Sequence, residues 1–168
     1  MKGYLSVAGA IVVGLLASQL PAYDQQYTQR LGGAVDELRI ITERFDASAE
    51  DAGLSRDAAL ARFVASGDDF LAGQGEDMAT VISRYERLSA HLAAVETANP
   101  IERTLDLTRF YDPEIGERTL ENFEPALPVT AEGLGFLAGG LVAGYIVFWL
   151  VFTFIASLFG RRRPVYRG

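Results

Sequence analysis

The stretch LGFLAGGLVAGYIVFWLVFTFIASLF, residues 134–159, decides the fold class of this chain. It contains 26 residues and no charged side chain. A helix rises about 1.5 Å per residue, so the stretch would extend roughly 39 Å against a membrane hydrocarbon core of about 30 Å. A helix of that length can span a membrane with some tilt. We therefore predict a transmembrane helix over residues 133–159.

A second uncharged run, YLSVAGAIVVGLLASQL, covers residues 4–20. A short basic start followed by an apolar run is typical of a retained anchor or of a cleavable signal peptide. Cleavage after Gln19 or after Ala22 would place Gln19 or Leu20 where small residues are preferred, which favours a retained anchor. We predict a first transmembrane helix over residues 4–20, with a cleaved signal as the alternative.

Basic residues flank the two apolar runs on their outer sides. Lys2 precedes the first run, and Arg161, Arg162 and Arg163 follow the second. Because positive charge is retained on the cytoplasmic side, this pattern predicts cytoplasmic ends at residues 1–3 and 160–168. The segment between the runs would then lie in the periplasm of a bacterium, held at the inner membrane.

The segment over residues 21–132 carries all 22 acidic residues and ten of the 15 basic ones. A domain with so large an excess of negative charge repels nucleic acid, so we expect no DNA or RNA partner. The chain has no cysteine, so an exported domain here must rely on its core or on partners rather than on disulfides.

Two regions of the acidic segment show the apolar periodicity of helices. Apolar residues three or four positions apart predict one helix over about residues 24–47 and a second that ends at Asn99-Pro100. The first stripe is Tyr27, Leu31, Ala34, Leu38, Ile41 and Phe45, and the second is Gln74, Met78, Val81, Tyr85, Leu88, Leu92 and Val95. Their equal period and similar length predict an antiparallel helical hairpin.

Local signals divide the connection between these two helices. Gly53 predicts a helix end, and Ser55 predicts the N-cap of a short helix. Ser66, followed by Asp69 three residues later, resembles a capping box and predicts the start of the second long helix. The connector would then form the tip of the hairpin.

Two further features of the acidic segment have alternative interpretations. The pair Gly32-Gly33 indicates either a bend or close approach by another backbone, or a tolerated weakness in the helix. Asp112-Pro113 predicts a short accessory helix. Such short amphipathic pieces would lie near the lipid headgroups or pack as a third layer on the hairpin.

The residues offer little for catalysis. His91 is the only histidine and the sequence has no cysteine, so multi-histidine metal sites and thiol chemistry are excluded within one chain. Adjacent acidic pairs such as Glu50-Asp51 and Glu76-Asp77 are typical of a solvated surface. We predict no catalytic, cofactor-binding or metal-binding residues and no enzymatic activity.

Small residues recur every fourth position in both apolar runs. Spacing of this kind lets helices approach closely in lipid. The predicted helix or partner interface consists of Ser6, Ala10, Gly14 and Ser18 in the first run, and of Gly135 and Gly139 (with Ala143), Gly140, Gly144 and Trp149 in the second. The two runs either pack on each other or dock on another protein, and aromatic side chains around Trp149 would meet a helix or lipid.

Three blocks of the sequence resemble a family of small proteobacterial membrane proteins described as a domain of unknown function. The blocks are SQLPAYDQQYTQRLGGAVDEL (18–38), FDASAEDAGLSRDAALARF (45–63) and PALPVTAEG (125–133). The resemblance implies an integral membrane protein with this two-helix layout. It implies no activity and no functional residue.

The sequence therefore predicts an all-α membrane protein with two transmembrane helices and a periplasmic hairpin bearing short accessory helices. The function we expect is that of a non-enzymatic accessory, assembly or scaffolding protein of a larger inner-membrane complex. Its partners would be membrane lipids and other integral membrane subunits. The alternatives are a self-associating structural protein of the envelope and, more remotely, a ligand sensor or enzyme.

Overall fold

The computed structural model describes residues 2–99, 102–103 and 110–159. Every regular element in these ranges is a helix. Two helical stretches, Gly3–Asp51 and Ala131–Ser157, are long and apolar enough to cross a membrane. The prediction of an all-α chain with two candidate spans is confirmed. The side chain of Lys2 and residues Arg161, Arg162 and Arg163, expected to set the topology, lie outside the described part.

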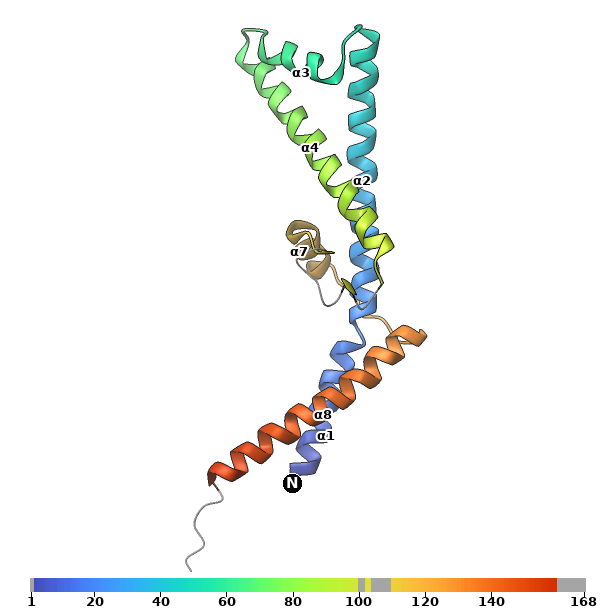
Figure 1. Cartoon of the computed structure of the whole chain (residues 1–168), viewed down its shortest axis with the longest axis vertical. Coiled ribbons are helices and arrows are strands. Elements are labelled where there is room, and N and C mark those ends of the chain that lie inside the picture. Colours follow the sequence, from blue (N-terminus) through green and yellow to red (C-terminus); the bar gives the residue numbers. More distant parts are fainter. Residues whose placement is uncertain (1, 100–101, 104–109, 160–168) are drawn as a thin grey trace, which may run out of the picture. The chain divides into compact units, whose positions relative to one another are not determined.

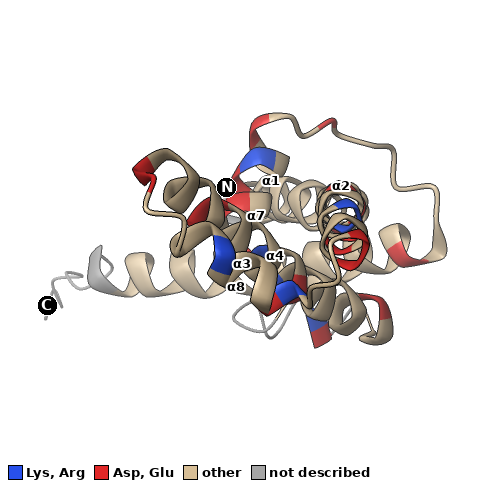
Figure 2. Ribbon diagram, turned by 90° about the horizontal axis from the view of Figure 1, so that it is seen from above, with Lys and Arg blue, Asp and Glu red and all other residues tan. Residues whose placement is uncertain are grey.

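The chain divides into two compact units, which we call the apolar unit and the acidic unit. The apolar unit comprises Met1–Gln25 and Phe123–Gly168, and the acidic unit comprises Gln26–Asn122. The acidic unit is thus shorter at both ends than the segment 21–132 marked out by charge. Figure 2 shows acidic and basic residues along α2 and α4, while α8 is uncharged beyond its first turn.

The apolar unit is built on α1 (Lys2–Ala17) and α8 (Ala131–Phe159), which cross each other (Figure 1). They run antiparallel, since Gly14 lies against Leu141 whereas Gly9 lies against Phe148, further along α8. The Thr130 hydroxyl accepts a hydrogen bond from Gly133 N–H at 3.0 Å and caps the start of α8.

A break separates α1 from α2 (Leu20–Asp51) at Ser18-Gln19. Pro21 has no N–H to donate to the carbonyl four residues back, and its ring crowds that carbonyl, so the helix is interrupted just before it. The Gln19 side chain joins this break to the segment before α8. Its Nε2 donates to Ala126 O at 3.2 Å, and its Oε1 accepts from Ala126 N–H at 3.1 Å.

Four helices supply the acidic unit: most of α2, then α3 (Arg56–Val64), α4 (Asp69–Thr97) and α7 (Pro113–Glu121). The Gly53 stop is confirmed by its positive φ of 68°, and the Ser55 cap by a hydrogen bond from Ala58 N–H to its hydroxyl. The capping box at Ser66 was wrong. Asp68 caps α4 instead, because its carboxylate accepts from the N–H groups of Phe70 and Leu71.

Helix α2 continues through Gly32-Gly33 and extends beyond the predicted 24–47 at both ends. No atom of the described residues outside the neighbouring helix backbone lies within 4 Å of a Cβ built at either glycine. Close approach by another backbone is therefore not the reason for this pair, and a tolerated weakness in the helix is favoured over it. Its cost is about 1 kcal/mol per glycine relative to alanine.

α2 and α4 come together near Tyr27 and His91, whose side chains are 2.8 Å apart, and diverge towards α3 (Figure 1). The buried faces reflect this divergence. Beyond Leu31 the buried positions on α2 are Val35, Thr42 and Ala49. Val35 and Thr42 each lie one residue after a position of the predicted apolar stripe, and Ala49 lies beyond its end. The predicted hairpin assumed helices that follow each other along their length, and helices crossing at an angle meet along different rows of side chains.

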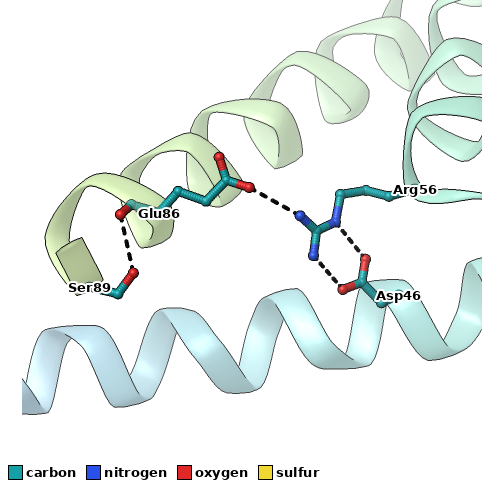
Figure 3. A network of polar contacts seen from close by, with 4 residues as sticks. All are labelled: Asp46, Arg56, Glu86 and Ser89. Atoms are coloured by element: carbon teal, nitrogen blue, oxygen red, sulfur yellow. Dashed lines mark hydrogen bonds and ion pairs between the residues drawn. The ribbon is translucent and has the colours of Figure 1, made fainter.

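Arg56, the first residue of α3, ties this helix to both of its neighbours (Figure 3). Its guanidinium donates two hydrogen bonds to Asp46 of α2, at 2.8 and 2.6 Å, and one to Glu86 of α4, at 3.1 Å. A bidentate pair fixes orientation as well as distance. The hydrogen bonds to Asp46 and the nearby carboxylates raise the pKa of Arg56, so it stays charged throughout the accessible pH range.

α7 begins at Pro113 with Asp112 as its cap, as the sequence predicts: the carboxylate accepts from Ile115 N–H at 3.1 Å. Arg87 of α4 pairs with Asp112 at 2.6 Å, and Arg84 pairs with Glu114 at 2.8 Å. These contacts with α4 favour the alternative in which the short helix packs as a further layer on the long ones.

Candidate functional site

The first candidate surface is the contact between α1 and α8. Ser6, Ala10, Gly14 and Ser18 are all buried. A Cβ added at Gly140 would lie 2.9 Å from Gly14 Cα, and one added at Gly144 would lie 3.0 Å from Ala10 Cα. Backbones this close leave no space for a side chain, so glycine is required at both positions of α8.

The other small-residue stripe of α8, Gly135, Gly139 and Ala143, has no close neighbour among the described residues. No atom lies within 4 Å of a Cβ built at Gly135 or Gly139, and Ala143 is exposed. Trp149 is also exposed, at 51%. The structure thus separates the predicted set: Gly140 and Gly144 face α1, whereas Gly135, Gly139 and Trp149 do not.

Sequence reasoning missed one residue of this contact. Gly9 lies outside the four-residue repeat of the first run, yet a Cβ built there would overlap the Phe148 ring. Phe148 therefore packs flat on the backbone of α1, and Phe152 lies next to it at 6.1 Å between ring centroids. A glycine within an apolar run was the available signal, but its partner could not be identified without the structure.

The second candidate surface is a groove in the acidic unit, where α2 and α4 diverge. It has a volume of about 540 Å³, and its walls come from the end of α2, from α3 and from the start of α4. The lining is mostly apolar, and its polar members are Ser48, Arg62 and Ser66. The sequence did not predict it, because regular spacing predicts helices packed side by side. We call it the tip groove.

A protein family described as "Protein of unknown function (DUF2937)" matches residues 1–161, nearly the whole chain. The chain belongs to this family. The resemblance recognised in the three sequence blocks is therefore confirmed at the level of a family of unknown function. No curated protein and no solved structure matches the chain. The DUF2937 match covers the two apolar helices and the acidic unit together, so both units are parts of one family architecture.

The acidic unit of this DUF2937 chain also contains a buried polar network. Tyr27, 3% exposed, accepts a hydrogen bond from Asp112 N–H at 2.7 Å and lies 2.8 Å from His91 Nε2. The ring of Tyr111 stacks on that of Tyr27 at 5.9 Å. Tyr27 thus joins α2, α4 and the segment that starts α7.

The Tyr27 hydroxyl and His91 Nε2 are 2.8 Å apart, and which of the two donates depends on the tautomer of the histidine. Burial, more than any other factor, lowers the pKa of His91. Burial also acts to raise the pKa of Asp112, but the hydrogen bonds from Arg87 and Ile115 N–H outweigh it and keep the carboxylate charged.

This arrangement accounts for structure more readily than for chemistry. His91 and Asp112 each have a hydrogen-bond or ion-pair partner within the chain, and neither of them lines the tip groove. Within the described ranges no group of three or more His, Asp or Glu side chains is placed to hold a metal ion. Among the described residues, two surfaces stand out as open for binding. One is the stripe of Gly135, Gly139 and Ala143 on α8, which we call the free stripe, and the other is the tip groove.

Proposed function

We propose that this chain is a non-enzymatic accessory, assembly or scaffolding protein of a larger complex in the bacterial inner membrane. It docks through the free stripe of α8 formed by Gly135, Gly139 and Ala143. Lys2 and the arginines 161–163 keep both ends in the cytoplasm. The acidic unit then lies in the periplasm and offers a second surface to the complex.

The free stripe is the observation that carries this proposal. α8 has two sets of small residues, and α1 covers the one that includes Gly140 and Gly144. No atom of the part of the chain that the structure describes lies within 4 Å of a Cβ built at Gly135 or Gly139, although each glycine costs a helix about 1 kcal/mol relative to alanine. A further helix could approach this stripe closely, and close packing is what drives helix association in lipid.

The test is purification of the tagged full chain from native membranes in a mild detergent, with mass spectrometry and a native mass. We expect a stoichiometric foreign membrane complex. Gly139→Leu should remove that complex and leave the fold intact, because no atom of the described residues lies within 4 Å of a Cβ built at this position. Phe154→Leu, a change on an exposed position of α8 outside the stripe, is the matched control and should retain it.

Recovery of the chain only with itself, at a multiple of 18.3 kDa, would contradict the accessory role and favour a self-associating envelope protein. Retention of the foreign complex by Gly139→Leu would contradict docking through the free stripe.

The orientation is tested separately with reporters active only in the cytoplasm. A reporter fused after Gly168 should be active, and one inserted in the turn at Gly53 should be inactive. Gly53 is exposed and has no neighbour within 4 Å of a built Cβ, so an insertion there disturbs little. The opposite pattern would place the acidic unit in the cytoplasm.

A further inference from the structure

The tip groove has walls that are held in place by contacts of their own. Phe63 of α3 packs against Phe45 of α2, with ring centroids 6.4 Å apart. On its other side it packs on Gly75 of α4, where an added Cβ would lie 2.6 Å from Phe63 Cβ. The Arg56 pairs with Asp46 and Glu86 fix the start of the same helix (Figure 3). The groove is therefore preformed.

The chemistry of the lining is uneven. Most of it is apolar, contributed by Phe45, Ala49, Ala52, Leu54, Ala59, Phe63 and Leu71. The two serines are already engaged: Ser48 donates to Arg44 O, and Ser66 accepts from Asp68 N–H. Polar groups of an extended peptide would find few partners on these walls, and unpaired polar groups are costly to bury. An alkyl chain brings no such groups.

Arg62 is the one charged residue that lines the groove. It makes no ion pair or hydrogen bond with a described residue, whereas Arg39, Arg56, Arg84, Arg87 and Arg118 are all paired with carboxylates. An arginine at an apolar groove supplies a charged anchor for an anionic group at one end of an apolar ligand.

The groups around Arg62 restrict the size of the negative charge that a ligand can carry there. The last turn of α2 contributes Ala49 to the groove, and Ala52 follows directly after the helix. This turn carries the acidic pair Glu50-Asp51 and the negative end of the helix dipole. A single negative charge can pair with Arg62 there, whereas a doubly charged phosphate is repelled more strongly. A carboxylate therefore suits the site better than a phosphate monoester.

We propose that the tip groove binds a single-chain carboxylate amphiphile of the fatty-acid class. Its carboxylate pairs with Arg62, and its alkyl chain lies against Phe45, Ala49 and Phe63. The groove volume of about 540 Å³ is in the range of about 300–1,000 Å³ typical of small-ligand sites. This site is independent of the free stripe of α8, so the proposal goes beyond the accessory role.

The test uses the full chain in nanodiscs of zwitterionic phosphatidylcholine and a twelve-carbon fatty acid with a photoreactive diazirine in its chain. We expect labelling of peptides that contain Phe45, Phe63 or Leu71, located by mass spectrometry. Unlabelled dodecanoate should compete, and dodecanol should compete about three- to tenfold less well because it lacks the charge. Each added methylene should raise affinity by about twofold to fourfold.

Variants decide the role of the arginine. Arg62→Gln should weaken binding about three- to tenfold, while Arg44→Gln, which removes another unpaired arginine that does not line the groove, should have no effect. Ala52→Phe should block the groove, and it acts at an exposed position, so the fold should survive. Circular dichroism checks the fold of each variant.

Labelling confined to α1 and α8 would show partition into the bilayer only and would overturn the proposal. Equal competition by dodecanol, or equal binding by the two arginine variants, would overturn it as well. If Ala52→Phe fails to fold, the comparison of Arg62→Gln with Arg44→Gln still decides whether the groove binds the carboxylate. The purification with Gly139→Leu tests the accessory role separately. The accessory role and the fatty-acid site can therefore each fail without the other.

Discussion

The apolar unit and the acidic unit use different forces to hold helices together. In the apolar unit α1 and α8 meet through small residues, with Gly14 and Gly140 bringing two backbones together. In the acidic unit the helices meet through large rings and charged groups, such as Phe45 on Phe63 and Arg56 on Asp46. Lipid offers no hydrophobic drive for helix pairing, so close contact must supply it, whereas water rewards burial of large side chains.

The largest test of this difference replaces Gly140 and Gly144 together by leucine. Each side chain would enter the backbone of α1, so we expect α1 and α8 to separate or to unfold, at a cost of about 2 kcal/mol or more. Thermal unfolding in detergent, followed by circular dichroism, measures it. The Gly135→Leu and Gly139→Leu double variant is the control and should unfold like the parent. Equal stability of the two variants would show that close packing does not hold this pair.

A polar counterpart in the acidic unit is Tyr27→Phe. It removes the hydroxyl that accepts from Asp112 N–H and contacts His91, and it leaves a buried donor without a partner. We expect a loss of about 1–3 kcal/mol in the free energy of unfolding. Tyr85→Phe on α4 is the matched control, because no hydrogen bond joins its hydroxyl to a described residue. A loss of the same size in both variants would show that the hydrogen bonds of Tyr27 do not cause the loss of stability.

Gly75→Ala asks whether close backbone packing is confined to the apolar unit. Here the added methyl would lie 2.6 Å from Phe63 Cβ, so α3 must shift, and we expect a loss of about 1–2 kcal/mol. Gly73→Ala, two residues earlier on the same helix, meets no atom within 4 Å and should gain up to about 1 kcal/mol from helix propensity. Chemical denaturation of both variants gives the comparison, which fails if they shift in the same direction.

The smallest expected effect is the pH dependence that comes from His91. Its pKa in the folded chain is lowered by burial, so below its unfolded value of about 6.5 the unfolded chain binds more protons than the folded one. Its contribution to stability is present above about pH 6.5 and is lost as the pH falls through the lowered value. His91→Gln should reduce this slope in thermal unfolding scans from pH 8 to 5. An unchanged slope would show that the pH dependence of stability comes from other titratable groups.

The sequence predicted the helices and several of their ends because those depend on neighbours along the chain. Gly53, Ser55 and Asp112 act within four residues of themselves, and each is confirmed. Ser66 failed as a cap because α4 starts at Asp69, so the Asp68 carboxylate accepts from the first-turn N–H groups of Phe70 and Leu71, whereas the Ser66 hydroxyl accepts from Asp68 N–H ahead of the helix. Local competition of this kind is hard to resolve from spacing alone.

Features that depend on distant residues were beyond the sequence. The two small-residue stripes of α8 have the same four-residue spacing, so the sequence does not indicate which of them packs against α1. Tyr27 and Asp112 are 85 positions apart, and their hydrogen bond is visible only in the fold. The tip groove exists because α2 and α4 diverge, and regular stripes predict helices that do not.

The pairing of Gln19 with Ala126 has a topological consequence. Both backbone groups of Ala126 are held by one side chain, across 107 positions of sequence. At the ends of the acidic unit, Gln26 and Asn122 line one small cavity, so the unit starts and finishes in the same place. A domain with adjacent ends can be inserted into a host without strain. We therefore expect that a short linker can replace the acidic unit while α1 and α8 remain packed.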